Sequence, residues 1–429
     1  MKDIIKLKLK ILARLIIKKY RPTVIGITGS MGKTSAKEAV YFVLKEKLSV
    51  RMSPKNYNSE IGLPLSIIGA TSGGRSLSGW LAVFWKAAWL LLFRDPAYPK
   101  VLVLEMGVDH PGDMDYLTSI VKPDVGLETA VSYSHIEYFG SVANIRKEKQ
   151  ILIEQVNNQG LSVLNYDDEN TRGMAGVSRA RVVTYGLKEG AQLRAQDIIF
   201  NFTRGNYELA GMNFKLNNQG AIVPVAMKNV MTESALYAAL AAAAVGLHFG
   251  MNLVDIARIL ADYALPPGRM NILPGIKHTF IIDDTYNSSP EAAVAALDIL
   301  GRMKVEAPAA KYAVLGDMLE LGSYTEEGHR RVGQKAAASS LDCLIAVGER
   351  SREMMRAAAE AGMDDSCLFY FDQPGEAGRF IQNRLKAGDI VLVKGSQGMR
   401  MEKIVKEIMA EPDRAKDLLV RQGEDWEDR

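Results

Sequence analysis

A glycine-rich segment near the start of the chain contains the residue types that hold a phosphate group. It reads Gly26-Ile27-Thr28-Gly29-Ser30-Met31-Gly32-Lys33-Thr34, follows an apolar run at 23–26 and leads into a helical pattern. Glycines let the backbone fold around phosphate oxygens, and a helix N-terminus adds a favourable dipole. In such a loop Lys33 reaches the β- and γ-phosphates and the Thr34 hydroxyl binds Mg²⁺. Nucleotide binding is therefore the strongest prediction from the residues alone.

The match to the full phosphate-loop pattern is incomplete, because Ile27 stands where the longer form has its first glycine. The shorter core from Gly29 to Thr34 is intact. The structural alternative is a glycine turn with an incidental lysine. A phosphate loop does not name a reaction, since GTPases, kinases, motor ATPases and ligases all carry one.

Alternating apolar runs and helical patterns surround this loop and predict an α/β fold with a mostly parallel sheet. The expected strands are 23–26, 101–104, 126–131 and 161–164, with helices from about Lys33 and over 142–156. Short alternating segments predict a small β-rich insert at about 192–225, before helices over 234–245 and 253–263.

A domain boundary is predicted at Pro266-Pro267-Gly268, because prolines end helices. Five further strands are expected beyond it, at 280–282, 312–315, 343–347, 367–370 and 390–393, in a Rossmann-like doubly wound domain. The predicted organisation is a basic amphipathic helix over 1–21, a central ATP-binding domain over 22–266 and a C-terminal domain over 267–429.

Composition excludes several other classes of protein. The net charge of +3 over 429 residues does not indicate a nucleic-acid partner. No apolar run reaches the roughly 18–20 residues of a membrane span. Cys343 and Cys367 both stand in apolar runs, which favours buried thiols over a disulfide or metal pair. We expect a cytoplasmic monomer, with contact to the inner membrane surface left open.

Two segments raise that question of membrane contact. Residues 1–21 carry eight basic side chains against Asp3, with Ile5, Leu9, Leu12 and Ile16 at helical spacing. Residues 79–93 are strongly apolar and include Trp80, Trp85 and Trp89. Each is either a helix packed on its own domain or a helix lying on a membrane surface.

Several short motifs in order along the chain resemble the Mur ligase superfamily. They are Thr28–Thr34, Asn56–Pro64, Glu105-Met106-Gly107, His110–Asp113, His135–Ser141 with Lys149, Gly268-Arg269, Asp283–Pro290, Gly316–Gly322, His329 and Lys394-Gly395-Ser396. The strings Asp283–Pro290 and Gly316–Gly322 are most similar to the subgroup that adds D-alanyl-D-alanine to a muramyl-tripeptide. The resemblance implies an ATP- and Mg²⁺-dependent ligase of peptidoglycan biosynthesis, which forms an amide bond through an acyl phosphate.

The resemblance also assigns roles to individual residues. It implies that Thr34, Glu105, His135 and Lys149 hold Mg²⁺, with Lys149 carbamylated, although Lys147 is close enough to be the alternative. It implies nucleotide contacts from Thr28 to Thr34 and from Asn229, Arg269 and Asp284. It implies substrate contacts from Asn56, Asn58, Asn287, Lys394 and Ser396.

The sequence departs from the family pattern in ways that keep alternatives open. The phosphate loop begins about 25 residues into the chain, where the family normally has an N-terminal UDP-sugar domain. Lys228 stands where the family often has histidine, and Gln397 where it often has arginine. The alternatives are a related ligase with another or lipid-linked acceptor, and a non-catalytic nucleotide-binding subunit. The retained Lys33, Thr34, Glu105, His135 and Asp284 favour an enzyme.

Overall fold

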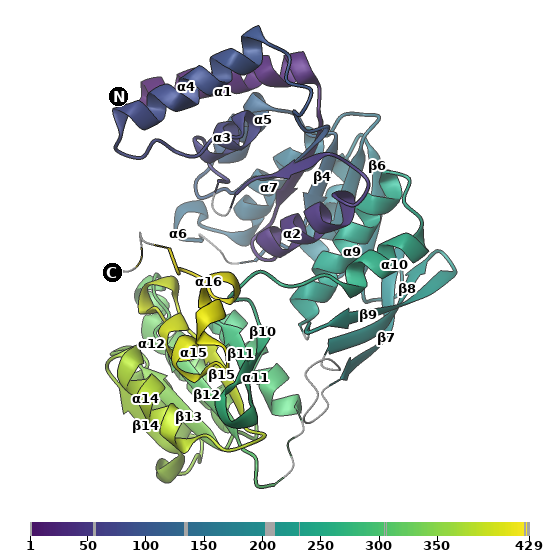
Figure 1. The fold of residues 1–429 in the computed structure, drawn as a ribbon. Helices are drawn as coiled ribbons and strands as arrows, with labels where there is room; N and C mark the ends of the chain where they lie inside the picture. Colours follow the sequence, from purple (N-terminus) through teal and green to yellow (C-terminus); the bar gives the residue numbers. More distant parts are fainter. Residues whose placement is uncertain are drawn as a thin grey trace. The chain divides into compact units, whose positions relative to one another are not determined.

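The computed structural model describes residues 2–54, 57–132, 136–201, 211–230, 232–303, 305, 307–423 and 426. The chain divides into two compact units (Figure 1). The first contains 1–198, 213–226 and 233–263, and the second contains 199–212, 227–232 and 264–429. Each unit is described on its own.

The first unit is built on a nine-stranded sheet in the order β2-β3-β1-β4-β5-β6-β7-β8-β9. From β2 to β7 in this order, each strand pairs in parallel with the next. The central strands are mostly apolar and almost completely buried on both faces, as expected for a parallel sheet. The bounds are β1 Thr23–Thr28, β2 Val50–Met52, β3 Val101–Glu105, β4 Val125–Glu128, β5 Leu161–Asn165, β6 Arg181–Gly186, β7 Leu193–Asn201, β8 Gly211–Asn218 and β9 Ala221–Lys228.

Helices cover this sheet. Their bounds are α1 Lys2–Tyr20, α2 Lys33–Leu44, α3 Gly62–Ile68, α4 Leu77–Leu92, α5 Asp113–Ile120, α6 Ile136–Phe139, α7 Val142–Glu154, α8 Glu169–Arg172, η1 Gly173–Val177, α9 Glu233–His248 and α10 Leu253–Ala261. The alanine-rich α9 packs along α2, the helix that follows the phosphate loop. Small side chains let these two helices approach closely and fix the position of α2.

The N-terminal helix α1 packs against α3 and α4 (Figure 1). Leu9, Ala13 and Ile16 are completely buried, in one core cluster with Val83 and Leu90 of α4. The predicted stripe at Ile5, Leu9, Leu12 and Ile16 therefore faces the protein. Within the described residues, no helix is both long enough and apolar enough to cross a membrane.

The second unit contains a six-stranded sheet in the order β10-β11-β15-β12-β13-β14. All neighbours pair in parallel except β10, which is an antiparallel edge strand. The strand bounds are β10 Asn271–Gly275, β11 Thr279–Asp284, β12 Lys311–Gly316, β13 Cys343–Val347, β14 Leu368–Phe371 and β15 Ile390–Lys394.

Helices lie on both sides of this sheet and bury two separate apolar clusters. Cys343 is buried and Cys367 only half-buried, and both are free thiols. The helix bounds are α11 Pro290–Arg302, α12 Thr325–Ala337, α13 Arg352–Glu360, α14 Pro374–Arg384, α15 Glu402–Ile408 and α16 Ala415–Leu418, with short helices η3 Ile276–His278, η4 Gly322–Tyr324, η5 Asp365–Cys367, η6 Gln397–Met399 and η7 Pro412–Arg414.

Candidate active site

The glycine-rich segment forms a loop between the central strand β1 and the helix α2. Gly29 has φ +147° and Gly32 has φ +81°, a region that other residues rarely adopt. A Cβ atom on Gly29 would lie 1.9 Å from the Thr129 hydroxyl oxygen, so a side chain cannot be accommodated there. The loop places backbone N–H groups at the start of a 12-residue helix, which is the geometry of a phosphate site.

The Lys33 ammonium folds back onto this loop. Its Nζ donates to the Gly29 carbonyl at 2.8 Å and to the Ser30 carbonyl at 3.5 Å. The loop is also bonded to the segment that follows β4, since the Ser30 N–H donates to the Ala130 carbonyl at 2.6 Å. Lys33 is therefore held where a nucleotide phosphate could replace the carbonyl oxygens as its partner.

Sheet register places two carboxylates beside the loop. In the parallel pairing, Glu105 of β3 stands opposite Ile27, and Glu128 of β4 stands opposite Thr28. Both flank β1 at the carboxyl edge of the sheet, where ligands of open α/β folds bind. From the sequence, Glu105 was predicted at this edge of the sheet, whereas Glu128 fell inside a longer predicted strand at 126–131.

Glu105 is buried and surrounded by polar groups from α2 and from the loop that precedes α3. Thr34 donates its hydroxyl to the carboxylate at 3.2 Å, Asn58 its amide at 3.3 Å, and Lys37 forms an ion pair at 3.3 Å. A threonine hydroxyl and a carboxylate oxygen at a phosphate site are ligands suited to Mg²⁺. The described residues contain no cluster of three or more His, Cys, Asp or Glu side chains that could hold a metal. Thr34 and Glu105 therefore fit a site in which Mg²⁺ is bound jointly by the protein and by phosphate oxygens. They do not fit a site in which the protein supplies every ligand.

Glu128 and Lys149 form a buried electrostatic pair. Burial raises the pKa of the Glu128 carboxyl above its usual range, while Lys149 and Lys33 oppose that rise. Burial lowers the pKa of the Lys149 ammonium, and Glu128 opposes that shift. No hydrogen-bond partner is present for either buried Glu128 carboxylate oxygen in the described structure. A neutral Lys149 amine is the form that can react with carbon dioxide.

The structure separates the two candidate lysines of α7. Lys149 is buried, whereas Lys147 is exposed. The neighbouring Glu148 is also buried and accepts the N–H groups of Gly112 and Met114, which fixes the start of α5. His135 and Asn56 lie outside the described residues, so their predicted roles stay predictions.

A second set of predicted residues meets in the C-terminal unit. Lys394, at the end of β15, forms a 2.6 Å ion pair with Asp284 at the end of β11 and donates to the Asn287 carbonyl at 2.9 Å. Ser396 accepts the Leu319 N–H at 2.8 Å, and the Asn287 residue itself is exposed. The Arg269 guanidinium lies over the Tyr286 ring at 4.2 Å. Asn229 is exposed after β9, in left-handed backbone with φ +56°.

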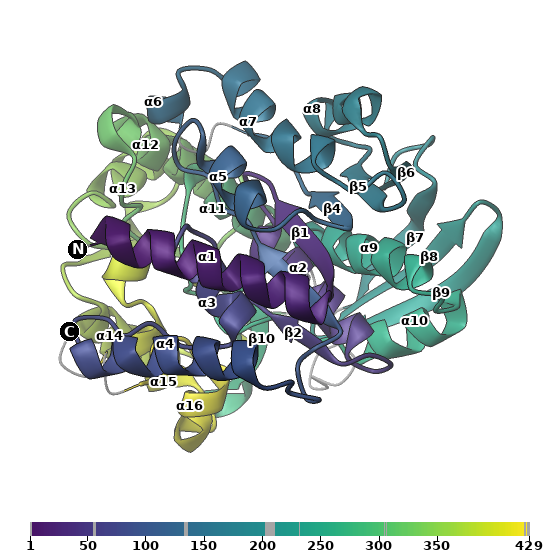
Figure 2. The same ribbon diagram turned by 90° about the horizontal axis from the view of Figure 1, so that it is seen from above.

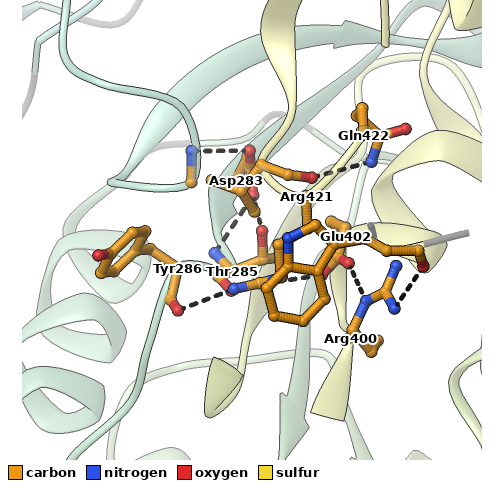
Figure 3. Close-up of polar contacts among 10 residues, drawn as sticks. Asp283, Thr285, Tyr286, Arg400, Glu402, Arg421 and Gln422 are labelled. Carbon is orange, nitrogen blue, oxygen red and sulfur yellow. Dashed lines mark hydrogen bonds and ion pairs between the residues drawn. The ribbon is translucent and has the colours of Figure 1, made fainter. Parts of the chain in front are cut away.

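A buried network holds the end of β11 and the segment that follows it, around Asp283, Thr285 and Tyr286 (Figure 3). Asp283 accepts the Gly268 N–H at 3.1 Å and the Thr285 hydroxyl at 2.6 Å. Arg421 donates to the Tyr286 carbonyl at 3.1 Å and to the Glu402 carboxylate at 2.7 Å. Burial raises the pKa of Asp283 to about 6, although its hydrogen bonds oppose this. This segment is thus fixed from both sides by buried charged groups.

Sequence reasoning missed Lys37, Glu128 and Arg421. Glu128 had a usable signal, since it ends an apolar run that precedes Thr129-Ala130, as Glu105 ends its own run. Lys37 lies one helical turn after Lys33 on the same face, so helix geometry could have found it. Arg421 had no local signal, because its partners are distant in sequence.

Two family models match most of the described fold. The Mur ligase middle domain matches residues 89–246, and the Mur ligase glutamate ligase domain matches residues 268–397. Together they span the two carboxylates beside the phosphate loop and the Asp284–Lys394 pair.

Individual relatives extend the match over nearly all of the chain. The UDP-N-acetylmuramoyl-tripeptide–D-alanyl-D-alanine ligase of Bacillus subtilis is 27% identical over 401 residues, covering 94% of this chain and 79% of its own. The enzyme of that name from Mycobacterium tuberculosis strain H37Rv is 30% identical over 409 residues, covering 91% of this chain and 73% of its own. The structure of MurF ligase from Thermotoga maritima in complex with ADP superimposes with a TM-score of 0.74 at 27% identity, covering 95% of this chain and 84% of that one.

Proposed function

Because the chain belongs to the Mur ligase family, we propose that it uses ATP and Mg²⁺ to join D-alanyl-D-alanine to a muramyl-tripeptide peptidoglycan precursor. The reaction forms an amide bond and releases ADP and phosphate. The terminal carboxylate of the tripeptide is first phosphorylated, and the dipeptide amine then displaces phosphate from the acyl phosphate. The relatives named for this reaction support the choice of substrates.

The residues of the first unit handle ATP in this proposal. Residues 28–34 bind the phosphates through backbone N–H groups, and Lys33 leaves the Gly29 carbonyl to pair with the transferred phosphate. Thr34 and Glu105 hold Mg²⁺, which neutralises developing charge on the phosphates when it is bound. Asn58 and Lys37 orient the Glu105 carboxylate.

Lys149 acts in the proposal as a carbamate. Carbamylation would turn a buried cation beside Glu128 into an anion that can bind a metal, together with His135. The lowered pKa of Lys149 supports this, because only the neutral amine is carbamylated.

The residues of the C-terminal unit receive the dipeptide and contact the nucleotide. Lys394 and Ser396 suit the dipeptide carboxylate, since a cation and a hydroxyl recognise that group. Asn287 contacts the substrates, and Arg269, Asp284 and Asn229 contact ATP. Asn56 and Asn58, which belong to the first unit, also contact the substrates. We also propose residues 22–266 and 267–429 as the two catalytic domains, with the protein acting as a cytoplasmic monomer.

The observation that carries the proposal is the phosphate loop with Glu105 and Glu128 in register on either side. The test is phosphate and ADP release with Mg²⁺-ATP and UDP-muramyl-tripeptide, with and without D-alanyl-D-alanine. Release that requires both substrates and yields a pentapeptide by mass is expected. Slow release that neither substrate changes would contradict the choice of substrates.

A matched pair of variants separates binding at the loop from general damage. Lys33→Ala removes the phosphate contact and is expected to abolish release, whereas Lys45→Ala alters an exposed lysine at the end of the same helix. Equal loss in both variants would argue against the assigned role of Lys33.

A second candidate keeps the chemistry and changes the acceptor to a lipid-linked muramyl peptide. The exposed apolar faces of α1 and α4 favour it. Substituting a lipid-linked tripeptide in detergent micelles for the UDP-linked form tests it directly. Faster turnover with the lipid-linked form would select this candidate.

A further inference from the structure

The helices α1 and α4 each present an apolar stripe to the outside. On α1 the stripe is Ile4, Leu7, Ile11 and Leu15, which are 46–60% exposed. On α4 it is Leu77, Leu81, Trp85, Trp89 and Leu92, followed by Phe93, which are 41–77% exposed. Residues at these spacings share one side of a helix. We call this set the two-helix face; it includes most of the large apolar side chains that are exposed in the described part of the chain.

Packing explains why both stripes point outward. The opposite sides of the two helices, at Leu9, Ala13 and Ile16 and at Val83 and Leu90, enter one core cluster with α3. Figure 2 shows α1 and α4 lying side by side in front of α3. Each helix is therefore apolar on two sides. A helix that only covered the core would need a single apolar side, so the outer side has no role in the core.

The two helices are firmly joined. Lys19 of α1 donates to the carbonyls of Leu90, Leu91 and Phe93 at 2.7–2.9 Å, which satisfies the open end of α4. The Tyr20 hydroxyl lies within 3.2 Å of the Leu90 and Phe93 carbonyls. Near the other end, Lys8 lies over the Phe84 ring at 5.9 Å. The two-helix face is therefore one surface rather than two independent segments.

The charged side chains of α1 and α4 are basic with one exception. Lys8, Arg14 and Lys18 of α1 are exposed, and Lys86 is the charged residue of α4. The described part of these two helices contains a single carboxylate, on Asp3. In a twofold dimer built on this face, a basic surface would meet a second copy of itself, which costs free energy. An anionic partner fits the charge, and a second copy does not.

We infer that the two-helix face docks in the plane of an anionic lipid bilayer. Apolar side chains with tryptophan enter the boundary between headgroups and acyl chains, and the basic side chains pair with lipid phosphates. At about 1.5 Å per residue, the 16 residues of α4 extend about 24 Å, which is shorter than the roughly 30 Å hydrocarbon core. With its inner side fixed to the core, α4 lies along the surface. The docking does not depend on the ligase reaction.

Flotation of the full chain with vesicles tests this inference. Vesicles of phosphatidylcholine containing phosphatidylglycerol should carry the protein upward, and vesicles of phosphatidylcholine alone should not. Trp80, Trp85 and Trp89 are three of the four tryptophans, so binding should shift fluorescence to shorter wavelength. Lipids brominated on the acyl chain should quench it. High salt should weaken binding, because it screens the basic side chains.

Matched variants separate the apolar and the charged contributions. Leu81→Ser with Trp85→Ser should abolish flotation, while Ile222→Ser with Val254→Ser, at exposed positions on other elements, should not. Arg14→Glu with Lys18→Glu should weaken binding more than about 25-fold, at about fivefold for each basic residue lost. Arg379→Glu with Lys416→Glu, exposed in the other unit, should leave it unchanged.

Three results would overturn the inference. One is no binding to anionic vesicles by a folded protein. Another is equal binding to neutral and anionic vesicles. The third is a dimer in solution, by light scattering, that Leu81→Ser with Trp85→Ser converts to monomer. Because ligase turnover is measured without vesicles, failure of docking and failure of the proposed reaction are distinguishable.

Discussion

Lys149 and Glu128 show how burial alone can prepare a residue for chemistry. Both are almost inaccessible to solvent, and removing water disfavours the charged form of each. Their mutual attraction opposes that effect without cancelling it. The Lys149 ammonium therefore loses its proton more easily than an ordinary lysine, because burial lowers its pKa.

Lys149→Arg tests this difference. Arginine keeps its proton and cannot form the carbamate, so turnover should fall at least about 100-fold by loss of a metal ligand. Lys147→Arg, two residues away and exposed, should stay within about twofold of the parent rate. Phosphate release under saturating substrates measures both. Equal rates in the two variants would remove Lys149 from the proposed site.

Gly29→Ala probes the geometry of the phosphate loop. The added methyl group would collide with the Thr129 hydroxyl at 1.9 Å, in backbone with φ +147°. The loop must move, so ATP affinity should fall at least about tenfold, with a stability cost of about 1–3 kcal/mol. Gly176→Ala is the control, because nothing lies within 4 Å of its added Cβ. Titration calorimetry with a non-hydrolysable ATP analogue measures the affinity, and an unchanged affinity would contradict the predicted crowding.

At the scale of the element, the end of α4 depends on a side chain from another helix. Lys19→Met removes the side-chain donor of the Leu91 carbonyl and leaves the Leu90 and Phe93 carbonyls to share the Tyr20 hydroxyl, which should cost about 1 kcal/mol. Lys18→Met, the exposed neighbour, should cost little. Urea unfolding monitored by fluorescence of the α4 tryptophans is the measurement. If both variants unfold at the same urea concentration as the parent, the contacts of Lys19 do not stabilise α4.

The strand β11 carries a buried carboxyl with a predictable pH dependence. The pKa of Asp283 is about 6 in the folded protein against an ordinary value of 3.8, so the folded state binds the proton more tightly. Its contribution to stability is therefore present at low pH and is lost as pH rises through about 4 to 6.

Asp283→Asn removes that titration. The altered hydrogen bonds change the free energy of unfolding by an amount that does not depend on pH. On top of this, the free energy of unfolding of the variant, relative to that of the parent, should rise by roughly 2 kcal/mol from pH 4 to pH 7. Chemical unfolding at several pH values measures the difference. Asp413→Asn, at an exposed position, serves as the control. A difference that stays flat with pH would show that Asp283 is not titrating in the folded state.

Strong local patterns predicted the central elements, because their physical causes are local. The loop glycines and the apolar runs of β1, β3, β5 and β15 are each visible in a few consecutive residues. The short edge strands β2 and β10 were missed, because partial burial weakens the apolar pattern. The Arg421 network joins segments more than a hundred residues apart, so no local pattern could predict it.

At the scale of the molecule, each unit contains its own polar set. Lys33, Thr34 and Glu105 meet in the first unit, and Asp284 and Lys394 meet in the second. The family resemblance implies that both sets serve one reaction. In the fold, each set lies at the ends of parallel strands of its own unit. His135 and Asn56, outside the described residues, stay predictions.

Nucleotide and metal together should stabilise the whole chain. A ligand at about 100 times its dissociation constant adds about 2.7 kcal/mol, which corresponds to a rise on the order of 5 °C in melting temperature. A non-hydrolysable ATP analogue with Mg²⁺ should produce this rise in the parent and not in Lys33→Ala. Chelation of Mg²⁺ by EDTA should remove most of it. A full rise in the presence of EDTA would contradict the assigned role of Thr34 and Glu105.

The helix α1 contributes to the core with one side and to the exposed two-helix face with the other. Proteolytic removal of residues 2–20 would strip Leu9, Ala13 and Ile16 from the core and deprive α4 of Lys19. Proteolytic removal of α1 therefore could not release a folded, active form of this protein from the proposed membrane surface. Cleavage there would expose core residues of α3 and α4 to water and destabilise the first unit.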